Sequence, residues 1–239
     1  MKTVILMLLL IFATCHATPC FASDADEWNR LEKLVRDGLI DKTDAKKQII
    51  ALHDKLVKTY SGIEKDESLF FPVKGYGPDS IGGAGGSGFK PGGYNFYDGN
   101  RHGGHPAHDI FVKDKNQDTL DDETGKPVEI VAYASGIVIA VNTIWKYPSG
   151  IRSGKYIWVF SPVLNQYCYY VHLGSVLVKT GDIIKAGQTI GLLGRTGKNA
   201  YPRRSPTHLH FSCLSFDHGN MTPYNTYKEL LHARIADKK

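Results

Sequence analysis

The fold class is decided by segments such as Thr207-His208-Leu209-His210-Phe211-Ser212-Cys213, a short run rich in β-branched, aromatic and apolar residues. Five similar runs precede it, and glycine or polar turns separate them. They are Val128–Tyr133, Ile137–Val141, Tyr156–Phe160, Tyr167–His172 and Thr189–Leu193. Their length and spacing are typical of antiparallel strands, so the sequence predicts a mainly β protein built on an antiparallel sheet.

Helical patterns flank the predicted sheet. Between residues 23 and 65, a break at Asp37-Gly38 and a candidate cap at Thr43 indicate two short amphipathic helices, that is, a helical hairpin. Its apolar stripes are Trp28, Leu31 and Val35, then Ala45, Ile49, Leu52 and Leu56. We expect the hairpin to pack on the main domain. Residues 74–104 are glycine-rich, and we expect them to form a long irregular segment. The pattern of residues 222–236 predicts one C-terminal helix.

The composition is that of a globular protein. The 239 residues are 42% hydrophobic and 22% charged, and they suffice for one substantial domain with a small appendage. The net charge of +5 is spread along the chain instead of clustered. This distribution disfavours a nucleic-acid partner.

The N-terminus has the pattern of a signal peptide. A lysine precedes an apolar run that is too short to span a bilayer comfortably, and small residues follow, with Ala17 or Ala22 as cleavage positions. We therefore expect residues 1–22 to be removed on export to the periplasm or the medium, and the mature chain to have no transmembrane segment. The residues before Cys15 and Cys20 match a lipid-attachment site poorly, which favours a soluble exported protein over a lipoprotein.

Cys168 and Cys213 are the two cysteines of the predicted mature chain. In an oxidising compartment such a pair suggests a disulfide. However, Cys168 lies four residues before His172 and Cys213 lies three after His210. On regular strands this difference in parity places the cysteines on opposite faces relative to those histidines, so two buried thiols are favoured over a bridge.

Three histidine-bearing segments are candidates for chemistry. His105 and Asp109 are four residues apart and can hold one metal ion together, although this spacing also occurs by chance. His208 and His210 share one face of a predicted strand, roughly 6.5–7 Å apart, which suits either one site or a polar surface patch. His172 ends a Tyr-Val-His-Leu segment, where a lone histidine is more often structural than catalytic.

In this order, the three segments resemble those of the lysostaphin-type (LytM-like) zinc metallopeptidases, the murein endopeptidase family. That family has His-x-x-x-Asp, then Tyr-x-His-Leu, then His-Leu-His-Phe. The glycine-punctuated scaffold is also similar: Ala134–Ala140 resembles the family's opening hairpin, and Val178–Gly197 resembles its long hairpin. The resemblance covers Phe70–Tyr224, and we expect residues 66–239 to form the metallopeptidase domain.

The resemblance implies a catalytic zinc site. His105, Asp109 and His210 would bind one zinc ion per chain, and His172 and His208 would be the catalytic pair beside it. Two neutral imidazoles and one carboxylate leave the ion with a net charge of about +1 and an open position, as in catalytic sites. The implied reaction is hydrolysis of peptide cross-bridges in bacterial peptidoglycan by metal-activated water. Strand parity alone permits the opposite assignment of His208 and His210.

The chain departs from the family pattern at two positions. Ala107 stands where the family usually has glycine, and His108 where it has a β-branched residue. Because neighbouring residues on a strand point to opposite faces, His108 should point away from Asp109, toward a supporting or surface position. Some family members carry an asparagine upstream that fills the fourth zinc position and keeps the enzyme latent. Asn95 and Asn100 are both candidates for that role.

Several other functions fit less of the sequence. A histidine-triad nucleotide hydrolase needs a third alternating histidine, where this chain has Ser212. The segment Gly181–Gly187 resembles a hairpin of biotin- and lipoate-carrying domains. Those domains need a lysine in a signature such as Met-Lys-Met, which this chain lacks. The main alternative is a metal-free, degenerate relative that serves as a wall-binding or amidase-activating partner.

A calcium site is a weaker hypothesis for the loop Asp114–Asp122. Oxygen-bearing side chains alternate along it, as in the first half of a calcium-binding loop. Thr119 occupies the position of the usual glycine, and Gly125 that of the closing bidentate glutamate. A solvated acidic loop is therefore the alternative.

Overall fold

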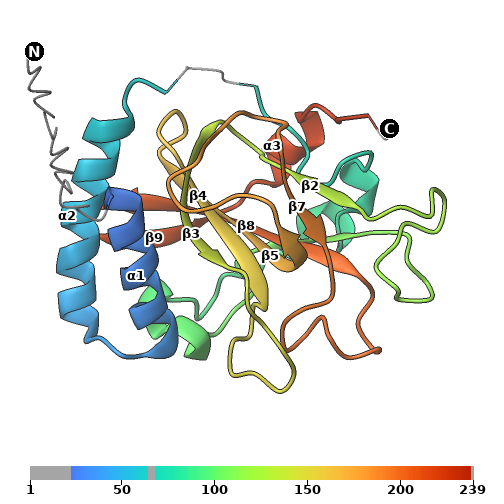
Figure 1. Cartoon of the computed structure of the whole chain (residues 1–239), viewed down its shortest axis with the longest axis horizontal. Coiled ribbons are helices and arrows are strands. Elements are labelled where there is room, and N and C mark those ends of the chain that lie inside the picture. Colours follow the sequence, from blue (N-terminus) through green and yellow to red (C-terminus); the bar gives the residue numbers. More distant parts are fainter. Residues whose placement is uncertain (1–22, 64–67, 238–239) are drawn as a thin grey trace, which may run out of the picture.

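A computed structural model of the chain describes residues 23–63 and 68–237, so the predicted signal peptide lies outside the described residues. Within them, nine strands form one sheet in which every paired strand is antiparallel, which confirms the predicted fold class. The strands are β1 (His108–Phe111), β2 (Glu129–Val131), β3 (Gly136–Asn142), β4 (Lys155–Ser161), β5 (Gln166–Val176), β6 (Ile183–Ile184), β7 (Thr189–Leu193), β8 (His208–Asp217) and β9 (Asn220–Tyr224). The main order is β1-β8-β5-β4-β3-β6, while β9 pairs with β8, and β7 with β5 and β2. The central strands β3, β4, β5 and β8 are labelled in Figure 1.

Two helices precede the sheet and form the predicted hairpin. Helix α1 (Asp24–Asp37) begins with a capping box between Ser23 and Asp26, and it ends at Gly38, which has the left-handed conformation that favours glycine. Helix α2 (Lys42–Tyr60) is capped by Asp41, not by Thr43 as the sequence suggested. The side chain of Asp41 accepts a hydrogen bond from the backbone nitrogen of Thr43 at 2.7 Å. Both predicted apolar stripes are buried.

The C-terminal region differs from the prediction of one long helix. Residues Asn220–Tyr224 form β9, and only Tyr227–His232 is helical, as α3. The two-residue turn His218-Gly219 has positive φ at both positions, 46° and 81°. Such turns match the twist of a tight hairpin, so pairing with β8 replaces the first part of the expected helix.

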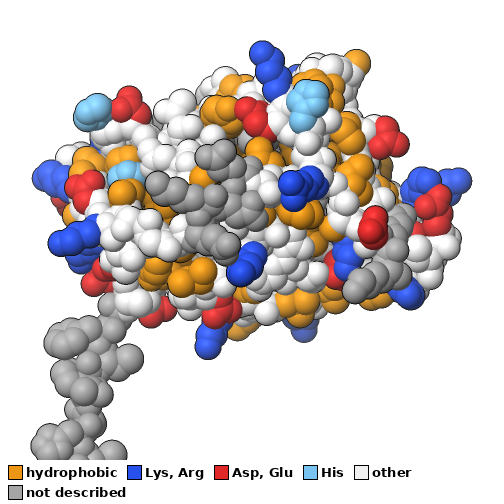
Figure 2. All heavy atoms as spheres, turned by 90° about the horizontal axis from the view of Figure 1, so that it is seen from above, with side chains coloured by type: hydrophobic (Ala, Val, Ile, Leu, Met, Phe, Trp, Pro, Cys, Tyr) orange, Lys and Arg blue, Asp and Glu red, His pale blue; other side chains and the backbone are white. Residues whose placement is uncertain are grey.

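On the face drawn in Figure 2, basic and acidic side chains are interspersed, and neither sign gathers into a large patch. No helix in the described parts of the chain is long and apolar enough to cross a membrane.

Three short 3-10 turns lie in the glycine-rich segment before β1: η1 (Pro78–Ser80), η2 (Ala84–Gly86) and η3 (Phe96–Arg101).

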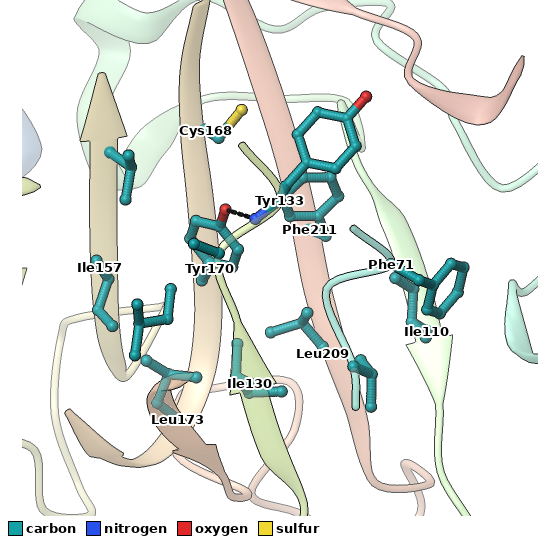
Figure 3. Packing of buried hydrophobic residues seen from close by; sticks show 14 of the residues in the cluster. Phe71, Ile110, Ile130, Tyr133, Ile157, Cys168, Tyr170, Leu173, Leu209 and Phe211 are labelled. Carbon is teal, nitrogen blue, oxygen red and sulfur yellow. Dashed lines mark hydrogen bonds between the residues drawn. The ribbon is translucent and has the colours of Figure 1, made fainter. Parts of the chain in front are cut away.

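The sheet separates two hydrophobic clusters. The first, here called the helix-side cluster, joins the apolar stripes of α1 and α2 to alternate residues of the central strands, such as Trp158, Tyr167 and Val171. The second, the far-side cluster, takes the intervening residues, such as Cys168 and Tyr170. Figure 3 shows the far-side cluster, in which the Tyr170 hydroxyl accepts a hydrogen bond from the backbone nitrogen of Tyr133 at 2.8 Å.

A disulfide joins Cys168 and Cys213, contrary to the favoured expectation of two thiols. The two residues pair directly across β5 and β8, so their side chains share the far-side face. The parity argument failed because β5 is irregular at His172. Lys155 pairs with Leu173 while its neighbour Tyr156 pairs with Val171, which leaves His172 as an extra residue.

Candidate metal centre

Strands β1 and β8 place three of the predicted site residues. Asp109 pairs with His210, and Phe111 pairs with His208. Directly paired residues of an antiparallel ladder share a face, so these side chains lie together on the face of the helix-side cluster. His105 precedes β1 and is held by two backbone hydrogen bonds with Lys90, of 2.8 and 2.6 Å.

His105, Asp109 and His210 form a compact group, here called the metal-site trio. The Oδ1 atom of Asp109 lies 3.2 Å from Nε2 of His105 and 3.0 Å from Nδ1 of His210. One ligand atom from each of the three residues lies within 4.8 Å of the other two. Two imidazole nitrogens and one carboxylate oxygen at this spacing suit a tetrahedral metal ion with one open position.

The hydrogen bond at Nδ1 of His105 determines whether its Nε2 carries a hydrogen. Its Nδ1 lies 2.9 Å from the carbonyl of Gly88, so it must carry a hydrogen and donate it. In a neutral ring, Nε2 is then an acceptor that faces a carboxylate oxygen. Two acceptor atoms repel each other at this distance. Either a proton on Nε2 or a cation bound between Nε2 and the carboxylate makes the contact favourable. Metal-binding histidines typically donate their other nitrogen to such a carbonyl.

The ionisation of Asp109 matches either state. Burial raises the pKa of its carboxyl, but the hydrogen bonds from His105 and His210 outweigh burial and hold the pKa well below its usual range. The same hydrogen bond raises the pKa of His105, while burial lowers the pKa of His210. The carboxylate is therefore charged at neutral pH, and it is the negative centre around which the two rings are arranged.

His172 and His208 lie beside the trio. Their ring centroids are 5.0 Å apart, and the ring of His172 lies 5.8 Å from that of His210. The Nδ1 of His172 donates to the carbonyl of Thr196, and that of His208 donates to the carbonyl of Pro206, each at 2.8 Å. Both rings thus keep Nε2 as an acceptor when neutral. Burial is the main reason that the pKa of His172 falls to about 3.

The bulge at His172 turns its side chain toward the site. In a regular β5, His172 would share the far-side face with Cys168 and Tyr170. Instead it is the unpaired residue of a bulge, with a φ of 68°. Bulges re-aim side chains next to functional sites, and here the bulge brings His172 to the face that carries His208 and His210.

The other candidates do not belong to the metal-site trio, although Asn100 lines a cavity that the trio also lines. His108 points away from Asp109, as predicted, but it is buried and its Nε2 lies 3.0 Å from Oδ1 of Asn225, so a surface position was wrong. Asn95 caps η3 by accepting from the backbone nitrogen of Tyr97. Asn100 accepts a hydrogen bond from the backbone of Arg152 at 3.4 Å. The latency role of either asparagine stays a prediction.

The calcium hypothesis gains no support. In the described residues, the metal-site trio is the only group of three or more histidine, cysteine or acidic side chains that could hold a metal ion. The carboxylate of Asp114 already accepts from the backbone nitrogens of Asp118 and Thr119 and from the hydroxyl of Thr207. The loop residues therefore satisfy one another through turn hydrogen bonds.

The five site residues line one cavity of about 260 Å³. Its wall also includes residues that sequence reasoning missed, among them Glu32 of α1 and the aromatic side chains of Tyr94, Trp158 and Tyr169. One signal could have identified Glu32. It lies at helical spacing from Trp28 and Val35, on the apolar stripe of α1, where an acidic residue is unexpected.

Comparison with known proteins gives three kinds of similarity. The sequence profile of peptidase family M23 matches residues 117–224. The chain is 43% identical over 63 residues to the peptidoglycan DD-endopeptidase ShyC of Vibrio cholerae. These aligned residues are 26% of this chain and 13% of that protein. The match to this curated relative therefore spans far less than half of its length.

Among solved structures, lysostaphin from Staphylococcus simulans is 26% identical, covering 53% of this chain and 43% of that one, with a TM-score of 0.37. A zinc containing peptidase from Vibrio cholerae is 23% identical, covering 71% of this chain and 41% of that one, with a TM-score of 0.42.

Proposed function

Because the chain belongs to peptidase family M23, we propose that it is an exported zinc endopeptidase that hydrolyses peptide cross-bridges of bacterial peptidoglycan. The observation that carries the proposal is the contact of one Asp109 oxygen with both His105 and His210. Residues 1–22 are the export signal, residues 23–65 the helical hairpin and residues 66–239 the peptidase domain.

The donor set fits a zinc ion. Nε2 of His105, a carboxylate oxygen of Asp109 and Nδ1 of His210 are the ligand atoms that converge. The hydrogen bond from Nδ1 of His105 to Gly88 fixes the orientation of the ring, as a supporting contact does in metal sites. Bound zinc supplies a Lewis acid that polarises the scissile carbonyl and makes water nucleophilic at neutral pH.

His172 and His208 move the protons in this mechanism. Because each donates Nδ1–H to a backbone carbonyl, each presents Nε2 as an acceptor for a proton of the attacking water. Burial keeps His172 neutral, so its Nε2 is available at neutral pH. After accepting the proton, an imidazolium can donate it to the leaving amine of the cleaved peptide.

The metal-free alternative is disfavoured. Degenerate relatives lose ligand positions, whereas His105, Asp109 and His210 are all present and mutually oriented in this chain. A metal-free wall-binding protein also has no need of two further histidines with oriented acceptor nitrogens.

Metal content and hydrolysis, measured on matched variants, test the proposal. The purified mature protein should contain one zinc per chain and release new peptide termini from peptidoglycan sacculi, detected by mass spectrometry. His210→Ala should lose both zinc and activity. His208→Ala and His172→Ala should retain zinc and lose activity by about 10²–10⁴-fold. His218→Ala, an exposed histidine on β-hairpin β8–β9, is the matched control and should change neither.

Two results would contradict this assignment. A metal-free protein that is fully active would remove zinc from the mechanism. A His208→Ala protein that is metal-free, beside a His210→Ala protein that keeps zinc, would reverse the roles of the two histidines on β8. Mass spectrometry of digests from sacculi with different cross-links then identifies the bond that is cleaved.

A further inference from the structure

The cavity beside the metal-site trio has an aromatic wall. Trp158 and Tyr169 pair directly across β4 and β5, and their rings stack with centroids 4.0 Å apart. Tyr94, from the glycine-rich segment, lines the same cavity. At about 260 Å³ the cavity is just below the range of roughly 300–1,000 Å³ that is typical of small-molecule sites, so it accommodates a side chain, not a whole peptide.

Glu32 places a carboxylate in this aromatic cavity. The residue is 5% exposed and comes from α1, outside the predicted peptidase domain. The hydrogen bond that the structure shows for its side chain comes from the hydroxyl of Tyr156, at 2.6 Å. Burial raises its pKa to about 7, although Tyr156 and the nearby Arg36 and Lys33 act in the opposite direction.

Neither of the two arginines that line the cavity forms a direct salt bridge with Glu32. Arg36 donates to both carboxylate oxygens of Asp37, at 2.8 and 2.6 Å, and to the hydroxyl of Tyr156 at 2.8 Å. Arg152 donates to the backbone carbonyls of Asn100 and His102, each at 3.0 Å. Within residues 23–63 and 68–237, no salt bridge forms to Glu32. Arg36 reaches Glu32 only through the shared Tyr156 hydroxyl, so among the described residues this buried carboxylate has no cation in direct contact.

A primary ammonium group would supply the direct cationic contact that the Glu32 carboxylate lacks. Buried carboxylates are stabilised by a cation that also donates hydrogen bonds. Aromatic faces attract cations, most strongly when the site is shielded from water. A second carboxylate would instead be repelled by Glu32. A neutral apolar side chain would fill the space but leave the carboxylate unpaired.

We propose that this cavity binds a primary ammonium group on an aliphatic side chain of the substrate peptide, with Glu32 as its counter-ion and Tyr94, Trp158 and Tyr169 as its aromatic walls. The inference rests on the proposed peptidase function and names a determinant of its specificity.

Two soluble cross-linked peptides test the inference. They are identical except that the side-chain amine is free in one and acetylated in the other. The zinc-loaded protein should cleave the free-amine peptide with a kcat/KM about 10–100 times higher, the range expected for a hydrogen bond between charged groups. Glu32→Gln should reduce this ratio toward one. Glu27→Gln should keep it, because Glu27 lies on the same helix but pairs with Lys55 and lies outside the cavity wall.

A second measurement uses the unmodified protein, so it does not depend on the folding of a variant. Butylammonium should inhibit cleavage of the free-amine peptide competitively, and butan-1-ol at the same concentration should not. Equal cleavage of both peptides, preference for the acetylated one, or absence of inhibition by butylammonium would overturn the inference while leaving the peptidase proposal intact. A zinc-loaded protein that cleaves neither these peptides nor sacculi would instead refute the peptidase proposal.

Discussion

Replacing Glu32 by glutamine should stabilise the protein at neutral and alkaline pH but not in acid. Glutamine keeps an oxygen that accepts the hydrogen bond from Tyr156, and it removes the charge that burial penalises. The charged groups that affect the Glu32 carboxyl are Arg36, Lys33 and Asp37. All three are retained in the variant, so the ionisation of one carboxyl is what changes.

The size of the effect follows from the pKa of Glu32. Burial raises this pKa from 4.5 to about 7 in the folded protein. Between these values the unfolded chain has released a proton that the folded protein still holds, so the free energy of unfolding falls as pH rises. Each pKa unit corresponds to about 1.4 kcal/mol, which makes the loss about 3 kcal/mol between pH 4 and pH 8.

Urea unfolding at pH 4, 6 and 8 measures this effect. The difference in free energy of unfolding between Glu32→Gln and the unmodified protein should grow by about 3 kcal/mol from pH 4 to pH 8. Glu27→Gln is the control, because it removes the same charge from a partly exposed position on the same helix. A difference for Glu32→Gln that is constant with pH would refute the reasoning, since it would mean that Glu32 ionises normally in the folded protein.

Two further changes test the scaffold. Replacing both Cys168 and Cys213 by alanine should lower the free energy of unfolding by about 4 kcal/mol, because the bridge closes a loop across a separation of 45 residues. Urea unfolding measures this loss, and an unchanged free energy of unfolding would mean that the bridge does not form. Gly99→Ala should cost about 1–3 kcal/mol, because φ is 52° and the new Cβ collides with backbone carbonyls of α1. Its thermal unfolding is compared with that of Gly92→Ala, where no atom lies within 4 Å of the added Cβ.

Local pattern predicted most of the fold. The six predicted runs became the core of six strands, because β-branched and aromatic residues bounded by glycine have few other arrangements. Strands β1, β6 and β9 were not predicted. They have two to five residues each, and pairing with a neighbour determines them more than their own composition does. Asp109 lies on one of these short strands, so its position opposite His210 could not be read from alternation alone.

The site was predicted in its residues but not in its geometry. The order of the histidine motifs suggested the five side chains, whereas alternation along β5 placed Cys168 on the wrong face relative to His172. A single extra residue reverses every face assignment beyond it, and one sequence gives no sign of a bulge. The same error separated Cys168 from Cys213, which pair directly. One irregularity thus accounts for both the corrected disulfide and the position of a predicted catalytic histidine.

The hairpin α1–α2 matters to the site as well as to packing. Trp28 stacks on Tyr167 with ring centroids 4.7 Å apart, which fixes α1 against the sheet. The same helix carries Glu32 into the cavity wall, and its C-terminal turn lies against Gly99 in the segment that leads to His105. The boundary near residue 65 therefore separates two segments of sequence but not two functional units. Substitutions on α1 can change which substrate side chain is accepted while leaving every metal-site residue in place, and this is why Glu32 is separable by mutation from the metal-site trio.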